Sequence, residues 1–308
     1  MDNAVHTLNE ALRISGGDLQ AVFGMALRSA AITLIIAILT GTAQTLSEKG
    51  NDHTIDLAGV LAISLLALGD SRAYFGLGRE TLTALNSFSK VLLPALAGAA
   101  AASGVPAAAA ASYAVTAMFM DILISLSTGV LQPLVYAYLA AEISAAATDS
   151  DAMGAVAGFL KWACSTALTV IVLAFVLYLS VTGIVGSAVD VGAIRVTKTV
   201  VSTTLPVVGS ILTDAAGSVL AGAMTLKNSI GITGMASVLT LCMLPFLHLG
   251  AQYLLYKATS KLSAGVAGGR ISRLVNGIAG AFGLMLATVG ACGLMRFFSL
   301  ISMLSMRA

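Results

Sequence analysis

Charge is what this sequence most lacks. Of its 308 residues, only 10% are charged, whereas 58% are hydrophobic. A soluble domain usually carries about 25% charged residues, so this composition excludes an ordinary water-soluble globular protein. The formal net charge of +2 is small, and we expect no nucleic-acid partner.

Recognisable catalytic and metal-binding patterns are also missing. The sequence has no His-Glu-x-x-His motif, Walker P-loop or Gly-x-Ser-x-Gly motif. Its three cysteines, Cys164, Cys242 and Cys292, lie in apolar runs, and we expect free thiols packed as small hydrophobic groups. Asp121 and Asp214 could in principle form an intramembrane aspartyl pair, but no glycine-flanked motif accompanies them. We therefore expect no enzyme activity, metal or cofactor, and any ATP would be hydrolysed by a partner.

The sequence is instead rich in long uncharged runs. In lipid, every backbone amide must be satisfied within its own segment, so a run of about 18 or more uncharged residues predicts a membrane-spanning helix. We predict an all-α, polytopic transmembrane helical bundle with about six to eight membrane segments. The runs are Ser29–Leu46, Val91–Met120, Ile122–Ala141, Trp162–Val189, Asn228–Tyr256 and Leu274–Met295.

The polar segments predict a topology for the N-terminal part. Residues 1–28 resemble an amphipathic helix at the membrane interface, or alternatively a helix packed over a loop, and are too polar for the apolar core of a signal peptide. Residues 29–80 are predicted to form a transmembrane pair. The distribution of lysine and arginine places 70–90 and 257–273 in the cytoplasm and the acidic segment 47–56 outside.

Prolines suggest an internal duplication. Two leucine-proline pairs open small-residue-rich segments, and a second proline follows each at the same spacing. We predict a first membrane repeat at 81–190 and a second at 191–308, with Pro/Gly-interrupted helices; a chance match is the alternative. If every segment crosses, the repeats are inverted. The four prolines are Pro94, Pro133, Pro206 and Pro245.

The segment Val207–Leu226 is nearly hydrophobic enough to span a bilayer, yet it contains Asp214. On a helix, one face collects small and polar residues. A charge at the bilayer centre costs at least about 2.5–3.5 kcal/mol, so this face should meet protein or water. It either lines a pore or an interface, or Asp214 is a structural group that pairs with Lys227 or Lys198 or lies nearer the interface. The residues of the face are Ser210, Asp214, Gly217, Ser218, Ala221 and Thr225.

Three other polar residues in or beside apolar runs need an interpretation. Asp121 is either an embedded acid or the tip of a helical hairpin, and the hairpin is favoured. Arg296, like Lys227-Asn228, is predicted to lie at the interface with its side chain reaching toward water. His248 is predicted to be a satisfied core histidine.

The residues 181–234 resemble the signature of the stage III sporulation protein AE family. The resemblance covers most of 80–303 and gives no catalytic residues. It marks Pro206, Gly209, Asp214, Lys227 and Asn228 as positions to test. The matching features are Gly183, Asp190, Lys198, Leu205–Gly209, Asp214, Val219, Leu226–Asn228, Gly231 and Gly234, followed by Pro245, Tyr256-Lys257 and Gly293–Ile301.

This resemblance implies a role in endospore development. Such proteins sit in the mother-cell membrane around the forespore, as subunits of a secretion-like channel complex. The implied partners are other stage III A-operon proteins, including a secretion-type ATPase and ring-forming proteins, a forespore-side protein, and membrane lipid; a homo-oligomer is left open. The alternatives are a secondary transporter with inverted repeats and, more remotely, an intramembrane hydrolase.

Overall fold

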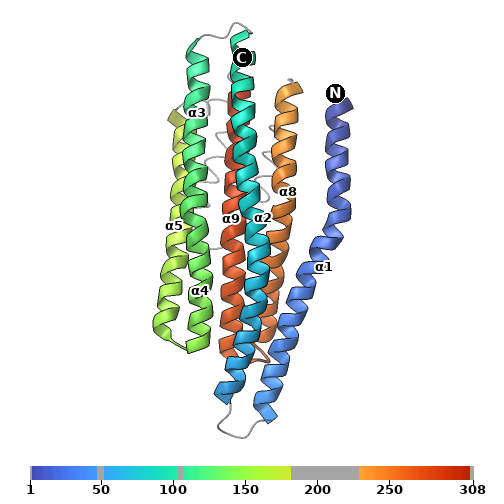
Figure 1. Ribbon diagram of the computed structural model, residues 1–308, viewed down its shortest axis with the longest axis vertical. Helices are drawn as coiled ribbons and strands as arrows, with labels where there is room; N and C mark the ends of the chain where they lie inside the picture. Colours follow the sequence, from blue (N-terminus) through green and yellow to red (C-terminus); the bar gives the residue numbers. More distant parts are fainter. Residues whose placement is uncertain (1, 47–51, 103–106, 182–228, 306–308) are drawn as a thin grey trace.

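The computed structural model describes residues 2–46, 52–102, 107–181 and 229–305, and all of these residues are helical apart from short turns (Figure 1). No strand occurs in these ranges. The elements are α1 (Asp2–Leu46), α2 (Asp52–Ala102), α3 (Ala107–Leu126), the π-helical segment η1 (Ser127–Leu131), α4 (Gln132–Thr148), α5 (Asp151–Val181), α8 (Ser229–Ser263) and α9 (Gly268–Ser305).

Six of the described helical segments are long and apolar enough to cross a membrane, which confirms the predicted fold class. Helix α1 continues unbroken through residue 28, and its span begins at Gln20 instead of Ser29. The interfacial position of 1–28 stays a prediction. The six spans are Gln20–Leu46, His53–Phe88, Met118–Thr148, Asp151–Ser180, Gly234–Ser263 and Gly268–Ile301.

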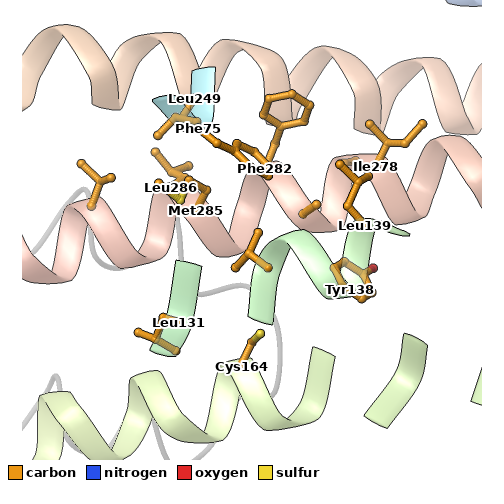
Figure 2. Close-up of a cluster of buried hydrophobic side chains, with 14 of the residues drawn as sticks. Phe75, Leu131, Tyr138, Leu139, Cys164, Leu249, Ile278, Phe282, Met285 and Leu286 are labelled. Carbon is orange, nitrogen blue, oxygen red and sulfur yellow. The ribbon is translucent and has the colours of Figure 1, made fainter. Parts of the chain in front are cut away.

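Helix α9 is the centre of the bundle. In Figure 1, α2 runs in front of it, α8 and α1 lie on one side, and α4 and α5 lie on the other. Figure 2 shows the buried core around Phe282, which collects Phe75 of α2 and Leu249 of α8. Glycines let large side chains approach α9 closely: a Cβ atom at Gly280 would overlap the hydroxyl group of Tyr138. Small residues of this kind allow membrane helices to pack tightly.

The C-terminal ends of α1, α4 and α8 and the N-terminal ends of α2, α5 and α9 lie at one end of the bundle, which we call the turn end (Figure 1, bottom). Arg270 Nη1 lies 3.2 Å from His53 Nδ1 and forms a hydrogen bond with it. Arg273 Nη2 lies 3.5 Å from Asp149 Oδ1. The prediction that 47–56 and 257–273 lie on opposite sides of the membrane is therefore wrong. It failed because residues 70–90 are not a loop but the middle of the continuous helix α2.

Arg270 links helix α9 to helix α4 at the turn end. Its guanidinium donates hydrogen bonds to the carbonyl oxygens of Ala146 (2.6 Å) and Ala147 (2.8 Å). These carbonyls belong to the last turn of α4, which ends at Asp149 in the left-handed conformation with φ 51°. The last carbonyls of a helix have no partner within the helix, and a cation there also opposes the helix dipole favourably.

Two predictions about single residues are corrected, and one is confirmed. Asp121 is not a hairpin tip, because α3, η1 and α4 continue one another from 107 to 148; it lies 3.6 Å from Lys90. Arg296 is only 3% exposed, and its guanidinium donates to Asn86 Oδ1 at 3.1 Å, so it is buried and not interfacial. His248 is satisfied as predicted, since its Nδ1 lies 2.9 Å from the Leu244 carbonyl oxygen.

The described prolines lie in continuous helical segments. Pro133 follows the π-helical segment η1 directly, and Pro245 lies inside α8. A π-segment before a proline is a usual way to accommodate the missing backbone donor. The hairpins α4–α5 and α8–α9, which the proline spacing would match to each other, both turn at the turn end. They are not inverted relative to each other, and the duplication itself stays a prediction.

Candidate functional site

The face predicted to line a pore lies outside the described residues. This applies to Ser210, Asp214, Gly217, Ser218, Ala221 and Thr225, and equally to Pro206, Gly209, Lys227 and Asn228. Their roles remain predictions. Within the described residues, the charged membrane-embedded element is instead helix α2.

Helices α2 and α9 run side by side in the same direction, and their contacts give the depth of each α2 residue. The ring of Phe75 lies 5.2 Å from that of Phe282, and Asn86 accepts a hydrogen bond from Arg296. The uncharged stretch 274–295 of α9 rises about 33 Å, the thickness of the hydrocarbon core. Residues of α2 near Phe75 therefore lie well inside the membrane.

One face of α2 carries charges at this depth. Arg72, Arg79 and Glu80 are exposed there, and none of the three forms an ion pair within the described part of the chain. Helical periodicity places them on a single arc together with small residues. We call this arc the outer face of α2; its exposed members are Leu65, Leu68, Gly69, Arg72, Ala73, Arg79, Glu80 and Thr83, so that two large apolar side chains share it with the charges.

The outer face cannot face acyl chains at equilibrium. Insertion scales give about 2.5–3.5 kcal/mol for each such charge at the centre of a membrane helix, so three charges would cost about 8–10 kcal/mol. That sum is comparable to the whole stability of a typical folded protein, about 5–15 kcal/mol. Water or polar protein groups around the outer face would remove this cost.

A second exposed arginine environment offers a contrast. Arg28 on α1 is exposed too, but its neighbours Met25 and Leu27 are exposed large apolar side chains. A long arginine side chain among such residues can reach toward the headgroups while its stem stays apolar. The arginines of α2 have neighbours of both kinds: Leu68, one helical turn from Arg72, is 44% exposed, whereas a Cβ atom at Gly69 or Gly76 would meet nothing within 4 Å.

The opposite side of α2 carries a half-buried carboxylate. Tyr256 of α8 donates a hydrogen bond to Asp70 Oδ2 at 2.7 Å, and the Tyr256 ring stacks on Phe282 with centroids 5.5 Å apart. Thr33 of α1 lies beside the same hydroxyl group. The carboxylate is thus held where α1, α2 and α8 meet, one half-turn of helix away from Arg72.

Polar side chains continue along α8 from this point. His248, Gln252 and Tyr256 follow one another at four-residue steps and share one helix face. The His248 ring lies 5.8 Å from that of Tyr74. Gln252 is fully buried, yet neither of its amide atoms has a hydrogen-bond partner among the described residues. The Asp70 cluster, made of these residues with Asp70, is a polar region inside the apolar bundle.

The sequence analysis predicted neither the charged outer face of α2 nor the contacts of Asp70 on the opposite side of this helix. It interpreted Arg72, Arg79 and Lys90 as markers of a cytoplasmic segment, and it did not examine Asp70. The available signal was the spacing of Arg72, Arg79 and Lys90 at seven and eleven residues, which places all three on one face of a helix. No group of three or more metal-ligating side chains occurs in the described residues.

Comparison with known proteins gives two matches in sequence. The model of the family "Stage III sporulation protein AE" matches residues 3–306. The stage III sporulation protein AE of Bacillus subtilis (strain 168) is 25% identical over 240 residues, which is 78% of this chain and 60% of that protein. The chain thus spans less than two thirds of the length of this relative. No solved structure matches.

Proposed function

Because the chain belongs to the stage III sporulation protein AE family, we propose that it is a non-enzymatic membrane subunit of a secretion-like channel complex that joins mother cell to forespore. Its six helical segments that are long and apolar enough to cross a membrane support a membrane location, and in this proposal that membrane is the mother-cell membrane around the forespore. Other stage III A-operon proteins, among them a secretion-type ATPase and ring-forming proteins, would be its partners, together with a forespore-side protein. The sequence has no P-loop of its own.

The outer face of α2 is the observation that supports this function. Arg72, Arg79 and Glu80 are exposed at a depth where a lone subunit would meet lipid. An aqueous passage, completed by other subunits or other copies of this chain, would hydrate these charges. In the proposal, α2 borders that passage with its small and charged residues, and its core side anchors it to α8 and α9.

Cysteine labelling tests this placement. Single cysteines placed along residues 65–83 would be treated with a water-soluble maleimide in membranes of sporulating cells. We expect labelling at the outer-face positions 69, 72, 73, 79 and 83 and none at the buried positions Phe75 and Leu82. Of the native cysteines, Cys164 and Cys292 are buried and Cys242 is partly buried, so the chain without an added cysteine is the background control.

Charge substitution tests the function itself. The double variant Arg72→Gln with Arg79→Gln should insert and accumulate normally but lower the spore yield, and Arg72→Lys with Arg79→Lys should retain much of it. Arg28→Gln is the matched control, because it removes an exposed arginine of the same kind from α1. Normal spore yield from the double glutamine variant, or complete protection of the outer face from maleimide, would contradict an aqueous passage along α2.

A secondary transporter is the second candidate, and the Asp70 cluster favours it. An intramembrane carboxylate beside buried polar side chains is typical of ion-coupled carriers. The two functions differ in what the purified chain does alone. A transporter should move a solute into liposomes without partners, whereas a complex subunit should be inactive until its partners are added.

A further inference from the structure

Asp70 has a hydrogen-bond donor but no counter-ion. Its Oδ2 accepts a hydrogen bond from the uncharged Tyr256 hydroxyl group at 2.7 Å, and in the described part of the chain no cationic side chain forms an ion pair with it. The Tyr256 ring stacks on Phe282, which lies within the uncharged stretch 274–295 of α9. Charges in an apolar environment are normally paired or bound to a metal ion. The negative charge of Asp70 is therefore unbalanced at this depth.

Gln252 lies at the same contact between α2 and α8. Two contacts fix the register of these antiparallel helices: the hydrogen bond of Tyr256 to Asp70, and the ring of Tyr74 at 5.8 Å from that of His248. Gln252 is midway between Tyr256 and His248 and shares their helix face. It is 0% exposed, and the Tyr74 hydroxyl group lies near its amide. Yet neither Nε2 nor Oε1 has a hydrogen-bond partner among the described residues, which is rare for buried polar atoms.

Helix α1 adds a hydroxyl oxygen close to this level. Ala26 of α1 and Ala251 of α8 pack in one apolar cluster, and the two helices run in the same direction (Figure 1). Thr33, two turns beyond Ala26, therefore comes near the level of Tyr256, and it lies beside that hydroxyl group. Thr33 is fully buried and donates its own hydrogen to the Ser29 carbonyl oxygen at 2.8 Å. Its oxygen keeps lone pairs that can bind a cation.

We propose that Asp70, Gln252, Thr33 and Tyr256 bind a monovalent alkali cation, such as Na⁺, where α1, α2 and α8 meet. The carboxylate of Asp70 balances the charge, and the amide, hydroxyl and phenol oxygens complete the ligand set. Hard cations prefer oxygen ligands of these kinds. A water molecule on the ion can accept a hydrogen bond from Gln252 Nε2. Because Asp70 is half-buried, the ion can reach the carboxylate without opening the bundle.

The ligand set indicates the class of ion. It contains one carboxylate and otherwise neutral oxygens, so a single positive charge is neutralised and a double charge is not. Transition metals prefer nitrogen and sulfur ligands, and no group of three or more His, Cys, Asp or Glu side chains that could hold a metal occurs in the described residues. We expected no metal from the sequence, since Asp70 and Gln252 come together only in the fold.

Thermal unfolding and direct binding test the site on the purified full chain in detergent. Sodium chloride would be replaced by choline chloride at constant ionic strength, and bound radioactive sodium would be counted on the same protein. A cation that binds only the folded chain raises its unfolding temperature. We expect a higher unfolding temperature in sodium than in choline, and saturable binding of one sodium ion per chain.

Two variants separate ion binding from packing. Asp70→Asn keeps the size of the side chain but removes its charge, and it should weaken sodium binding by about a hundredfold. Gln252→Met removes an amide that has no partner in the described residues, so it should raise the unfolding temperature in choline. The same variant should weaken sodium binding about tenfold. A purely structural role for Gln252 would not produce these opposite changes.

Asp121→Asn and Gln132→Met are the matched controls. Asp121 also lies on a membrane helix, but it has Lys90 at 3.6 Å as its counter-ion. Gln132 is 5% exposed and its Nε2 also lacks a partner among the described residues, but it lies on α4. Each control should change the sodium affinity by less than about twofold, because distant sites act independently. Circular dichroism would show that every variant is folded.

Three results would overturn the proposal. One is the same unfolding temperature of the unmodified chain in sodium and in choline. Another is unchanged sodium binding by folded Asp70→Asn. The third is stabilisation at low pH that depends on Asp70 while sodium has no effect, since the carboxylate would then take up a proton instead of a metal ion. These readouts do not depend on the channel function, which is tested on the opposite side of α2 at Arg72 and Arg79.

Discussion

The hydrogen bond between Tyr256 and Asp70 gives the sharpest test of the structure. Tyr256→Phe removes the hydroxyl group but keeps the ring, which stacks on Phe282 with an interplanar angle of 9°. The variant therefore leaves Asp70 Oδ2 without its donor while the packing is retained. Asp70→Asn keeps the side-chain size and removes the charge, and the double variant completes a thermodynamic cycle.

The expected coupling energy lies between two limits. A hydrogen bond to a charged group is worth about 1.5–3 kcal/mol in a protein interior. Hydrogen bonds between membrane helices average about 0.6 kcal/mol and reach about 1.7 kcal/mol, because the unfolded chain in the membrane also finds partners. With a donor–acceptor distance of 2.7 Å and a carboxylate acceptor, we expect a coupling of about 1–2 kcal/mol.

The measurement is the free energy of unfolding of the purified protein in mixed micelles, as detergent composition is varied. Tyr253→Phe is the control: Tyr253 lies on the same helix, and its ring packs over Gly283. Loss of its hydroxyl group should cost less than about 0.5 kcal/mol. A coupling energy below about 0.3 kcal/mol between positions 70 and 256 would refute the argument, since independent sites are additive to within that value.

The other predictions use separate parts of the molecule. Arg270→Ala should lower the free energy of unfolding by about 3 kcal/mol, because two α4 carbonyls lose charged donors; Arg270→Lys, measured beside it, should recover part of the loss. Gly280→Ala should cost about 1–3 kcal/mol, since the new methyl group overlaps the Tyr138 hydroxyl, whereas Gly154→Ala, where a Cβ atom meets nothing within 4 Å, should be neutral or stabilising by up to about 1 kcal/mol. Asp214→Asn should impair spore maturation while immunoblots show normal accumulation; normal spore yield would count against a functional carboxylate there.

The fold class could be predicted from the sequence because it depends on one local quantity, the length of uncharged runs. A long uncharged run indicates by itself that the segment lies in lipid as a helix, because backbone groups without a hydrogen-bond partner are intolerable there. The state of His248 could be predicted for a similar reason, as its partner is a backbone carbonyl one turn away on the same helix. No long-range information was needed in either case.

Helix α2 could not be predicted in the same way. Its charges lower the hydropathy of 70–90 below that of its neighbours, so the segment was interpreted as a loop. Hydropathy sums residues without regard to the side of the helix on which they lie. In the folded chain, Phe75 and Leu82 face the core while Arg72 and Arg79 face outward, so one segment is both a core helix and a charged surface.

Arg296 shows the other limit of sequence reasoning. From its position at the end of an apolar run, an interfacial side chain was the natural expectation. The structure instead buries it against Asn86 on α2, with Asp121 of α3 nearby. Those partners come from distant parts of the chain, and only tertiary packing brings them together. A buried charge with partners costs far less than an isolated one, which is why burial is tolerated here.

If the chain is a subunit of a complex, as proposed, the two sides of α2 indicate how it would depend on the other subunits. Asp70 and Arg72 are two residues apart, so they point to nearly opposite sides of the helix. The protomer satisfies Asp70 itself, through Tyr256. It leaves Arg72 and Arg79 without a counter-ion in its described part, although a charge of either sign is costly in lipid. Partners or water must therefore stabilise the outer face, and the chain alone in a bilayer should be less stable than the chain in its complex. If isolated protein in liposomes proved as resistant to unfolding as protein in the native complex, the outer face would need no partner, and the reasoning from its charges would fail.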